Sequence, residues 1–259
     1  MNVRVILYCA LGGGPLLLGA LGAGQWAAWW LAGIVLALAF VPVALFGPRS
    51  VPGQFGTVAV ALLIITALCT WSEALIFLPT PEIRQHPFQP LIGSCVLYLI
   101  VAAVLAVLAK LLRLNRESAW EPEHRGFVGA ALMVLLCGIA YVLYYGVFGA
   151  LTYEFFTKGY YPDATRTVAR LGAWFWMIQF ARGVLMTVAT VPIIYTLRLR
   201  RRQTAVAVGA VIWIAGGLAP LLIPNPFMGP TLRLIHIAEI FTQNFPLGVT
   251  AALLLQTGR

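Results

Sequence analysis

A polar stripe runs through an otherwise apolar segment near the C-terminus, in the stretch TLRLIHIAEIFTQNFPLG at residues 231–248. Arg233, His236, Glu239 and Gln243 follow one another at spacings of three, three and four residues, which places them on one face of a helix. Asn244 lies beside this stripe. Such side chains can pair with opposite charges, hold or move a proton, and donate hydrogen bonds to an anion. The stripe is therefore the first candidate for chemistry.

Three other apolar segments carry polar residues that suit the same chemistry. Glu73 lies in one of them, and Arg182 follows Gln179 by three residues in another. Tyr144 and Tyr145 come near the end of a third segment, where tyrosines form either a membrane-interface belt or ligand contacts. One charge at the centre of a membrane helix costs about 2.5–3.5 kcal/mol on insertion scales. A chain with several such charges must pair them or hydrate them.

The elements that position these residues are predicted to be membrane helices. Of the 259 residues, 61% are hydrophobic and only 10% are charged, whereas soluble domains carry about 25% charged residues. Apolar runs near 20 residues long recur along the whole chain. We predict an all-α, polytopic helix bundle that forms a single integral-membrane domain over residues 1–259. Its eight expected spans are 5–23, 27–46, 55–79, 90–110, 127–151, 172–197, 204–223 and 232–256.

The distribution of cations predicts the orientation of the bundle. Cations are enriched on the cytoplasmic side of membrane proteins. One predicted face carries Arg4, Arg49, Lys110, Arg113, Arg116, Arg125, Arg198, Arg200, Arg201, Arg202 and Arg259, and the other carries Arg84, Lys158, Arg166 and Arg170. We expect both termini to be cytoplasmic, in a bacterial-type inner membrane. The first helix resembles a secretory signal, but we expect it to stay uncleaved.

Depth brings the polar residues of different spans together. At a rise of about 1.5 Å per residue, Glu73 and Glu239 lie roughly 10 Å below the non-cytoplasmic ends of their spans, and Arg182 lies about 15 Å below. Arg233 falls at the rim on the same side. We therefore expect one polar site in the outer half of the membrane, formed by Glu73, Tyr144, Tyr145, Gln179, Arg182, Arg233, His236, Glu239, Gln243 and Asn244.

Three functions remain open for this site. The leading one is binding or transport of a small anionic or lipid-like ligand, in which Arg182 and Arg233 meet an anionic group. In a second, Glu73 and Glu239 simply neutralise the two arginines and lock the bundle of a structural subunit. A third is an intramembrane hydrolase that uses Glu73, His236 and Glu239, which requires these three groups to converge within hydrogen-bonding reach. The loop TKGYYPDATRTVARLGAW, which begins at residue 157, either caps the site or is a solvated connection.

Several other classes are disfavoured by the same residues. The excess of 17 Lys and Arg over 8 Asp and Glu is explained by orientation, so nucleic acid is not expected as a partner. The partners we expect are the lipid bilayer and, because eight helices are few for a carrier, a second copy or a partner subunit. No metal or other cofactor is expected, and four cysteines in apolar runs are predicted to be free thiols. No repeat of 20–50 residues is visible, and no residues argue for an inverted four-plus-four repeat.

Overall fold

A computed structural model describes residues 3–21, 24–77, 85–121, 123–226 and 228–257 of the chain. The described residues are helical or loop and form no β-strand. Eight helical segments are long and apolar enough to cross a membrane, as predicted. The chain is accordingly a multi-pass, all-helical protein suited to a lipid bilayer.

Several of the spans change helix type along their length. In chain order, the eight spans are α1 (Val3–Gly12) with η1 (Gly14–Ala20), α2 (Trp26–Ala39) with α3 (Val41–Phe46), α4 (Val51–Ala61) with η2 (Leu62–Leu68) and α5 (Cys69–Phe77), α7 (Gln89–Leu111), α8 (Phe127–Thr152) with η3 (Tyr153–Thr157), α10 (Ala173–Thr196), α11 (Arg201–Trp213) with η4 (Ile214–Leu218) and α12 (Ala219–Leu222), and α13 (Pro230–Leu255). The segments η2, η3 and η4 are π-helical, a form found frequently at functional sites. A further short helix, α9 (Ala164–Leu171), lies between α8 and α10.

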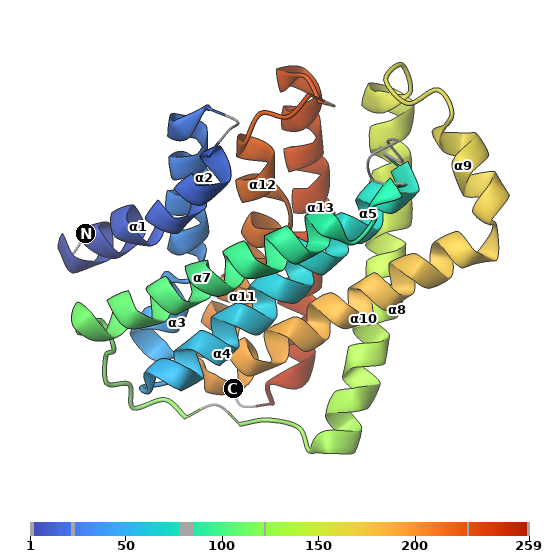
Figure 1. Cartoon of the computed structure of the whole chain (residues 1–259). Helices are drawn as coiled ribbons and strands as arrows, with labels where there is room; N and C mark the ends of the chain where they lie inside the picture. Colours follow the sequence, from blue (N-terminus) through green and yellow to red (C-terminus); the bar gives the residue numbers. More distant parts are fainter. Residues whose placement is uncertain (1–2, 22–23, 78–84, 122, 227, 258–259) are drawn as a thin grey trace.

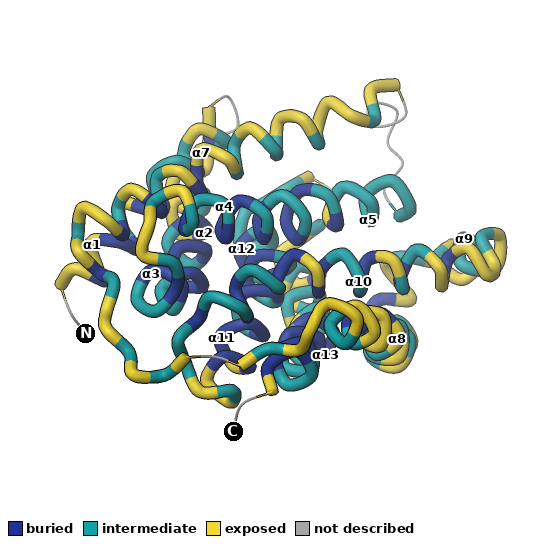
Figure 2. Tube along the Cα trace, turned by 90° about the horizontal axis from the view of Figure 1, so that it is seen from below, coloured by how far each residue is buried: buried dark blue, intermediate teal, exposed yellow. Residues whose placement is uncertain are grey.

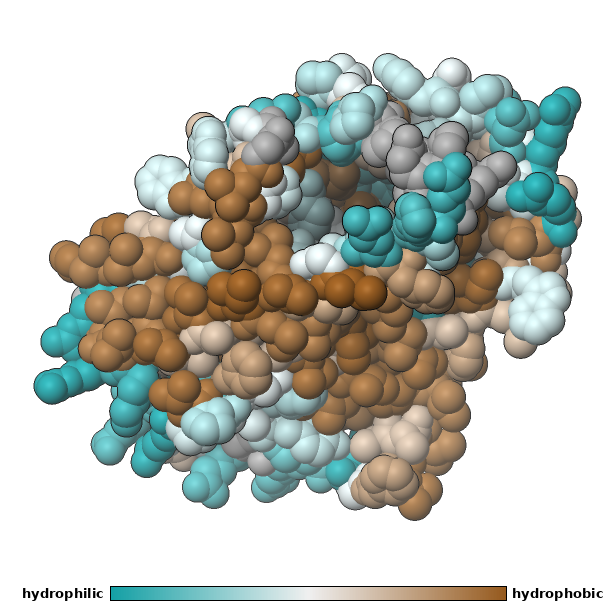
Figure 3. All heavy atoms as spheres, in the orientation of Figure 1, coloured by the Kyte–Doolittle hydropathy of each residue, from teal (hydrophilic) through white to brown (hydrophobic). Residues whose placement is uncertain are grey.

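The long helices fall into two groups with different directions (Figure 1). The helices α1, α4–α5, α7 and α10 run obliquely in that view, whereas α2, α8, α11–α12 and α13 stand more upright. Buried residues concentrate in α10 and α11, in the middle of the bundle, and the outward sides of α7 and α8 are exposed (Figure 2). Hydrophobic residues form a broad band across the molecule, with hydrophilic residues above and below it (Figure 3).

The two halves of the chain repeat one another. Every residue from 31 to 48 has the same burial class as the residue 150 positions later. The π-helix η4 likewise falls within the 150-residue equivalent of η2. In α1 and α8 the buried positions have identical spacing: Val5, Tyr8, Cys9 and Gly12 match Val134, Cys137, Gly138 and Tyr141. In α7 and α13 the matching buried positions are Val101, Ala102, Leu105, Ala106 and Ala109, and Leu247, Gly248, Ala251, Ala252 and Leu255.

The repeat is direct rather than inverted, because each half contains four spans and therefore enters the membrane from the same side. One helix of each half also packs against the other half. The second span of the first half, α2, packs against η4 and α12, and its equivalent α10 packs against α4 and η2. Each direction group in Figure 1 thus holds three spans of one half and one span of the other. The sequence analysis missed this repeat, because burial class is kept while residue identity is mostly not.

One end of the bundle is strongly basic, and we call it the basic face. It carries Arg49, Lys110, Arg113, Arg116, Arg125, Arg198, Arg200, Arg201 and Arg202. It lies at the bottom of Figure 1, where the connection from α7 to α8 crosses under the molecule. This connection is pinned by backbone hydrogen bonds from Arg116 N to Leu45 O (2.7 Å) and from Arg125 N to Leu255 O (3.3 Å).

Candidate functional site

A cavity of about 570 Å³ opens at the end of the bundle opposite the basic face. Its walls come from α5, α8 with η3, α9, the start of α10, η4 with α12, and α13. Most of the lining is apolar or aromatic, including Tyr145, Tyr153, Phe175 and Trp176. Ionisable side chains line it on one side only, where α5 and α13 contribute Glu73, His236 and Glu239. The cavity is thus an apolar chamber with one polar wall.

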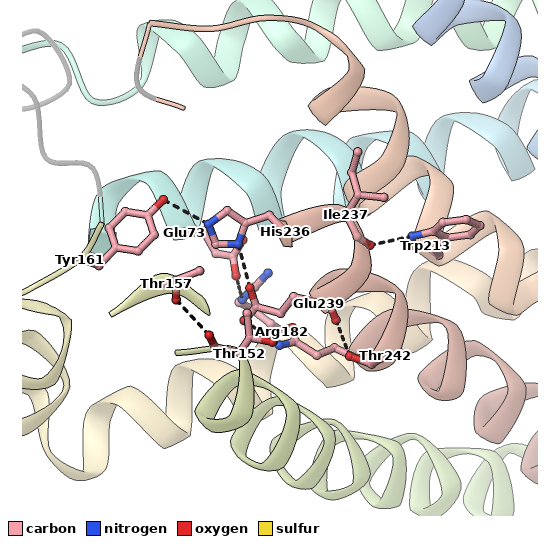
Figure 4. Close-up of polar contacts among 11 residues, drawn as sticks. Glu73, Thr152, Thr157, Tyr161, Arg182, Trp213, His236, Ile237, Glu239 and Thr242 are labelled. Atoms are coloured by element: carbon pink, nitrogen blue, oxygen red, sulfur yellow. Dashed lines mark hydrogen bonds and ion pairs between the residues drawn. The ribbon is translucent and has the colours of Figure 1, made fainter. Parts of the chain in front are cut away.

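The polar stripe of α13 forms a connected hydrogen-bond chain on this wall (Figure 4). Nδ1 of His236 lies 2.7 Å from Oε2 of Glu239, and Gln243 donates from Nε2 to Oε1 of Glu239 at 3.2 Å. Nε2 of His236 lies 3.1 Å from the hydroxyl of Tyr161. With Glu239 ionised, the carboxylate accepts from Nδ1–H, so the neutral imidazole accepts from the Tyr161 hydroxyl at Nε2. The helical spacing seen in the sequence therefore produces a relay of four side chains.

A second cluster of polar side chains, formed by Glu73, Arg182 and Gln179, lies beside this relay and reaches the same cavity. Arg182 on α10 donates from Nη1 to Oε1 of Glu73 at 2.5 Å and to Oε1 of Gln179 at 2.8 Å. The Arg182 side chain is 8% exposed, whereas that of Glu73 is 34% exposed. Arg182 also lies over the ring of Tyr141, with 5.8 Å from Cζ to the ring centroid. Arg182 is thus held below the cavity, and Glu73 presents the carboxylate to it.

Three of the ten residues that the sequence pointed to lie away from the cavity. Arg233 donates from Nη1 to the carbonyl oxygens of Leu221 and Leu222, both at 3.3 Å, and so caps the C-terminal end of α12. The amide of Asn244 reaches Ile212 O at 3.5 Å. The hydroxyl of Tyr144 lies 3.0 Å from Oγ1 of Thr250, toward the bundle interior.

The other seven are brought together. Glu73, Tyr145, His236, Glu239 and Gln243 line the cavity, and Arg182 with Gln179 supports Glu73 from below. The expected lock is present in part, because Glu73 does pair with Arg182. Glu239 pairs with His236 instead of Arg233, which reaches backbone carbonyls.

The sequence left open whether the segment before α10 covers the cavity. Helix α9 packs against α5 and α10, and its Ala164, Thr165, Val168 and Ala169 face the cavity. These positions are spaced as one face of a helix, so the amphipathic stretch ATRTVARL was the available signal. Gly172 joins α9 to α10 at φ 53° and ψ −127°, a conformation that is accessible essentially only to glycine.

Tyr161, just before α9, ties this cover to the polar wall through His236. Burial raises the pKa of the Tyr161 hydroxyl, and the negative charge of Glu239 raises it further. The phenol therefore stays protonated well above neutral pH and remains a hydrogen-bond donor. Of the two possibilities left open for this loop, the geometry corresponds to the cap.

A metal centre has no cluster to build on in the described residues, where no group of three His, Cys, Asp or Glu side chains gathers. The four cysteines are free thiols, as expected. No protein-family model, no curated protein and no solved structure matches this chain. What the cavity does has to be argued from its own geometry.

Proposed function

We propose that this protein binds a small amphipathic, lipid-like molecule in the cavity, from the non-cytoplasmic side of a bacterial-type inner membrane. The single observation that carries this proposal is the composition of the wall: one polar relay inside a chamber that is otherwise apolar and aromatic. Pockets of about 300–1,000 Å³ that combine an apolar lining with a few placed polar groups are typical of organic ligands. The volume of about 570 Å³ fits a short lipid-like molecule.

The charges at the wall favour a ligand whose polar end is a cation or a hydrogen-bond donor. Neither arginine that suggested an anionic ligand lines the cavity, since Arg182 is held by Glu73 and Gln179 and Arg233 by backbone carbonyls. The groups that do face the cavity are the carboxylates of Glu73 and Glu239, together with tyrosine and tryptophan rings. Carboxylates and aromatic faces together attract an ammonium group.

Binding is better supported than passage across the membrane. Below the cavity the bundle is filled by fully buried side chains such as Leu62, Ile65 and Ile212. The buried hydroxyls of Thr187 and Thr190 on α10 donate to backbone carbonyls of their own helix, at Gly183 and Thr187. The excess of cations on the basic face supports a cytoplasmic location for that end. The cavity then faces the other side.

An intramembrane hydrolase is the second candidate, because Tyr161, His236 and Glu239 form the kind of hydrogen-bonded chain that moves protons. Against it, Glu73 pairs with Arg182 rather than joining His236 and Glu239. A hydrolase would convert an ester analogue of the ligand, whereas a binding protein would return it intact. Mass spectrometry of the recovered ligand separates the two.

The proposal can be tested with two fluorescent probes that share one tail. Short alkyl chains that carry a dansyl group at one end and either a free amine or a free carboxylate at the other would be titrated against the protein in nanodiscs, following dansyl emission. We expect saturable binding, with the amine preferred about tenfold or more over the acid. Glu239→Gln should abolish this preference, and Glu154→Gln, which removes an exposed carboxylate paired with Lys158, should leave it unchanged. Preference for the acid would restore an anionic ligand, and saturable binding of neither probe would overturn the proposal.

A further inference from the structure

A second cavity, of about 440 Å³, lies on the basic face in the first half of the chain. Arg49, Lys110 and Arg113 line it together with Gln54, Asn115 and Glu117. Three cations thus surround it against one carboxylate. Within the described part of the chain none of the three takes part in an ion pair. The cavity therefore carries uncompensated positive charge.

The backbone around this cavity is held in place by polar side chains. Gln54, which is 5% exposed, donates from Nε2 to Pro48 O at 2.9 Å and fixes the turn that carries Arg49. Arg198 donates from Nη2 to Oδ1 of Asn115 at 2.9 Å, which orients the amide on the other wall. The cavity is consequently a built feature, whereas a loose group of surface cations would lack this frame.

Arg113 occupies a position where arginine is unfavourable for the backbone. After α7 the chain makes a helix-ending turn in which Leu114 N bonds Ala109 O (3.0 Å) and Arg113 N bonds Lys110 O (3.1 Å). This pattern requires a left-handed residue that is usually glycine, yet Arg113 holds it with φ 50°. A cation is therefore kept beside the cavity at a cost to the backbone. Such an outlier points to a role for the side chain.

The repeat supplies an internal comparison, because the equivalent residues in the second half are uncharged and hydrogen-bond to one another. The equivalents of Arg49 and Lys110 are Leu199 and Gln256, and Gln256 donates from Nε2 to Leu199 O at 3.4 Å. Arg201 on α11 donates from Nε to Leu253 O at 3.1 Å and closes the remaining space. The fold therefore does not require a cationic cavity at this place. Cations that only orient the protein in the membrane would also not need to line a cavity.

We propose that this cavity binds a phosphate-type anion, presented either by the headgroup of an anionic phospholipid or by a soluble phosphate. Arginine offers paired donors that match phosphate oxygens, and lysine adds a compact positive charge. The cavity lies where spans end at the membrane surface, at the first turn of α4, whose peptide dipoles also favour an anion. This site is separate from the outer cavity and stands whether or not the outer cavity binds a ligand.

Native mass spectrometry of the delipidated protein tests the site. Wild type should bind one phosphatidylglycerol about tenfold or more tightly than phosphatidylcholine, because about two to three basic groups act on the headgroup. The double variant Lys110→Gln/Arg113→Gly should lose this preference. The matched control Arg200→Gln/Arg202→Gln removes two cations from the same face in the other half and should keep it. Displacement of the lipid by millimolar inorganic phosphate would assign the site to soluble phosphate.

The design separates a lost site from a lost fold, because glycine suits the left-handed conformation at position 113 and the variant should unfold at the same or a higher temperature. Equal loss of preference in the test and control variants would overturn the proposal in favour of a diffuse surface charge. Absence of any headgroup preference in wild type, with no binding of inorganic phosphate, would also overturn it.

Discussion

The two halves of the molecule share a backbone plan but have opposite polarity at equivalent places. At the outer end, the positions of Gln179 and Arg182 in the second half correspond to Trp29 and Ala32 in the first. Ala32 is as deeply buried as its charged counterpart, so the helix packing does not need the charge. The remaining cavity residues Glu73, His236, Glu239 and Gln243 correspond to Ile223, Pro90, Gly93 and Leu97. At the basic face the first half carries the cationic cavity, whereas in the second half the equivalent residues Leu199 and Gln256 are hydrogen-bonded to one another.

This difference shows that the backbone plan shared by the two halves does not by itself require the buried polar residues. A scaffold that needed ion pairs for its packing would need them in both halves. The outer cavity takes His236, Glu239 and Gln243 from the second half and Glu73 from the first, whereas the cavity on the basic face is lined by residues of the first half. Substitutions that make one half resemble the other therefore test whether equivalent positions in the two halves behave alike.

The largest effect is expected from Arg182→Ala, which installs the residue of the first half at the equivalent position. Loss of Arg182 leaves the partly buried carboxylate of Glu73 without its partner, so we expect a loss of about 3 kcal/mol in the free energy of unfolding. Adding Glu73→Ile, the residue at the equivalent position 223, should recover most of it. Unfolding titrations in mixed micelles measure both. A double variant as unstable as the single one would contradict the comparison.

The equivalent glycines of α2 and α10 should both resist enlargement, but to different degrees. A Cβ at Gly33 would meet Gly13 O at 2.4 Å, which is backbone, whereas a Cβ at Gly183 would meet the Cβ of Tyr141 at 2.5 Å. We expect Gly33→Ala to cost about 2–3 kcal/mol and Gly183→Ala about 1–2 kcal/mol, because the three nearest atoms at Gly33 all belong to the backbone of Gly13, whereas at Gly183 the one comparably close atom is the Cβ of Tyr141. Thermal unfolding of the two variants in one lipid provides the measurement. The reverse order would show that the two halves do not pack equivalently.

The helices α7 and α13 are equivalent but end differently, and this predicts a stabilising substitution. Gln256 ends α13 in an extended conformation, whereas Arg113 follows α7 with φ 50°. Arg113→Gly should raise the free energy of unfolding by about 1 kcal/mol, since it relieves the left-handed strain. The comparison is made in detergent without anionic lipid, where no headgroup contributes. A destabilised Arg113→Gly would mean that the arginine side chain holds the turn together.

A smaller effect concerns the connection between the halves. His124 stacks on Tyr195, with ring centroids 4.1 Å apart, and burial lowers the pKa of its imidazole. Because the folded pKa lies below the unfolded one, its contribution is present above the unfolded pKa of about 6.5 and is lost as pH falls through the folded pKa. The unfolding midpoint should therefore drop between pH 6.5 and 5, and by less in His124→Gln. Identical pH profiles for both proteins would contradict this assignment.

The spans were predictable because each is an apolar run bounded by prolines and charged residues, and the α13 stripe was predictable because helical spacing fixes its face. The pairing between charged residues of different spans was not predictable. Arg182 and Glu73 are 109 residues apart in sequence, and nothing local distinguishes Glu73 from Glu239 as the partner. Arg233 donates to carbonyl groups at the end of α12, and the packing of α12 against α13 is a tertiary feature that the local sequence does not reveal. The repeat was hidden because close packing is met by different small and large residues in the two halves.

The packing of α2 against the second half of the chain has a consequence for biosynthesis. Helix α2 enters the bilayer early, but η4 and α12, against which it packs, are made only after residue 213. At about 5–20 residues per second, α2 waits on the order of 10–30 s for these partners. During that interval its apolar surface must be shielded by lipid or by the insertion machinery. The packing of the first half is therefore completed only after η4 and α12 of the second half have been made.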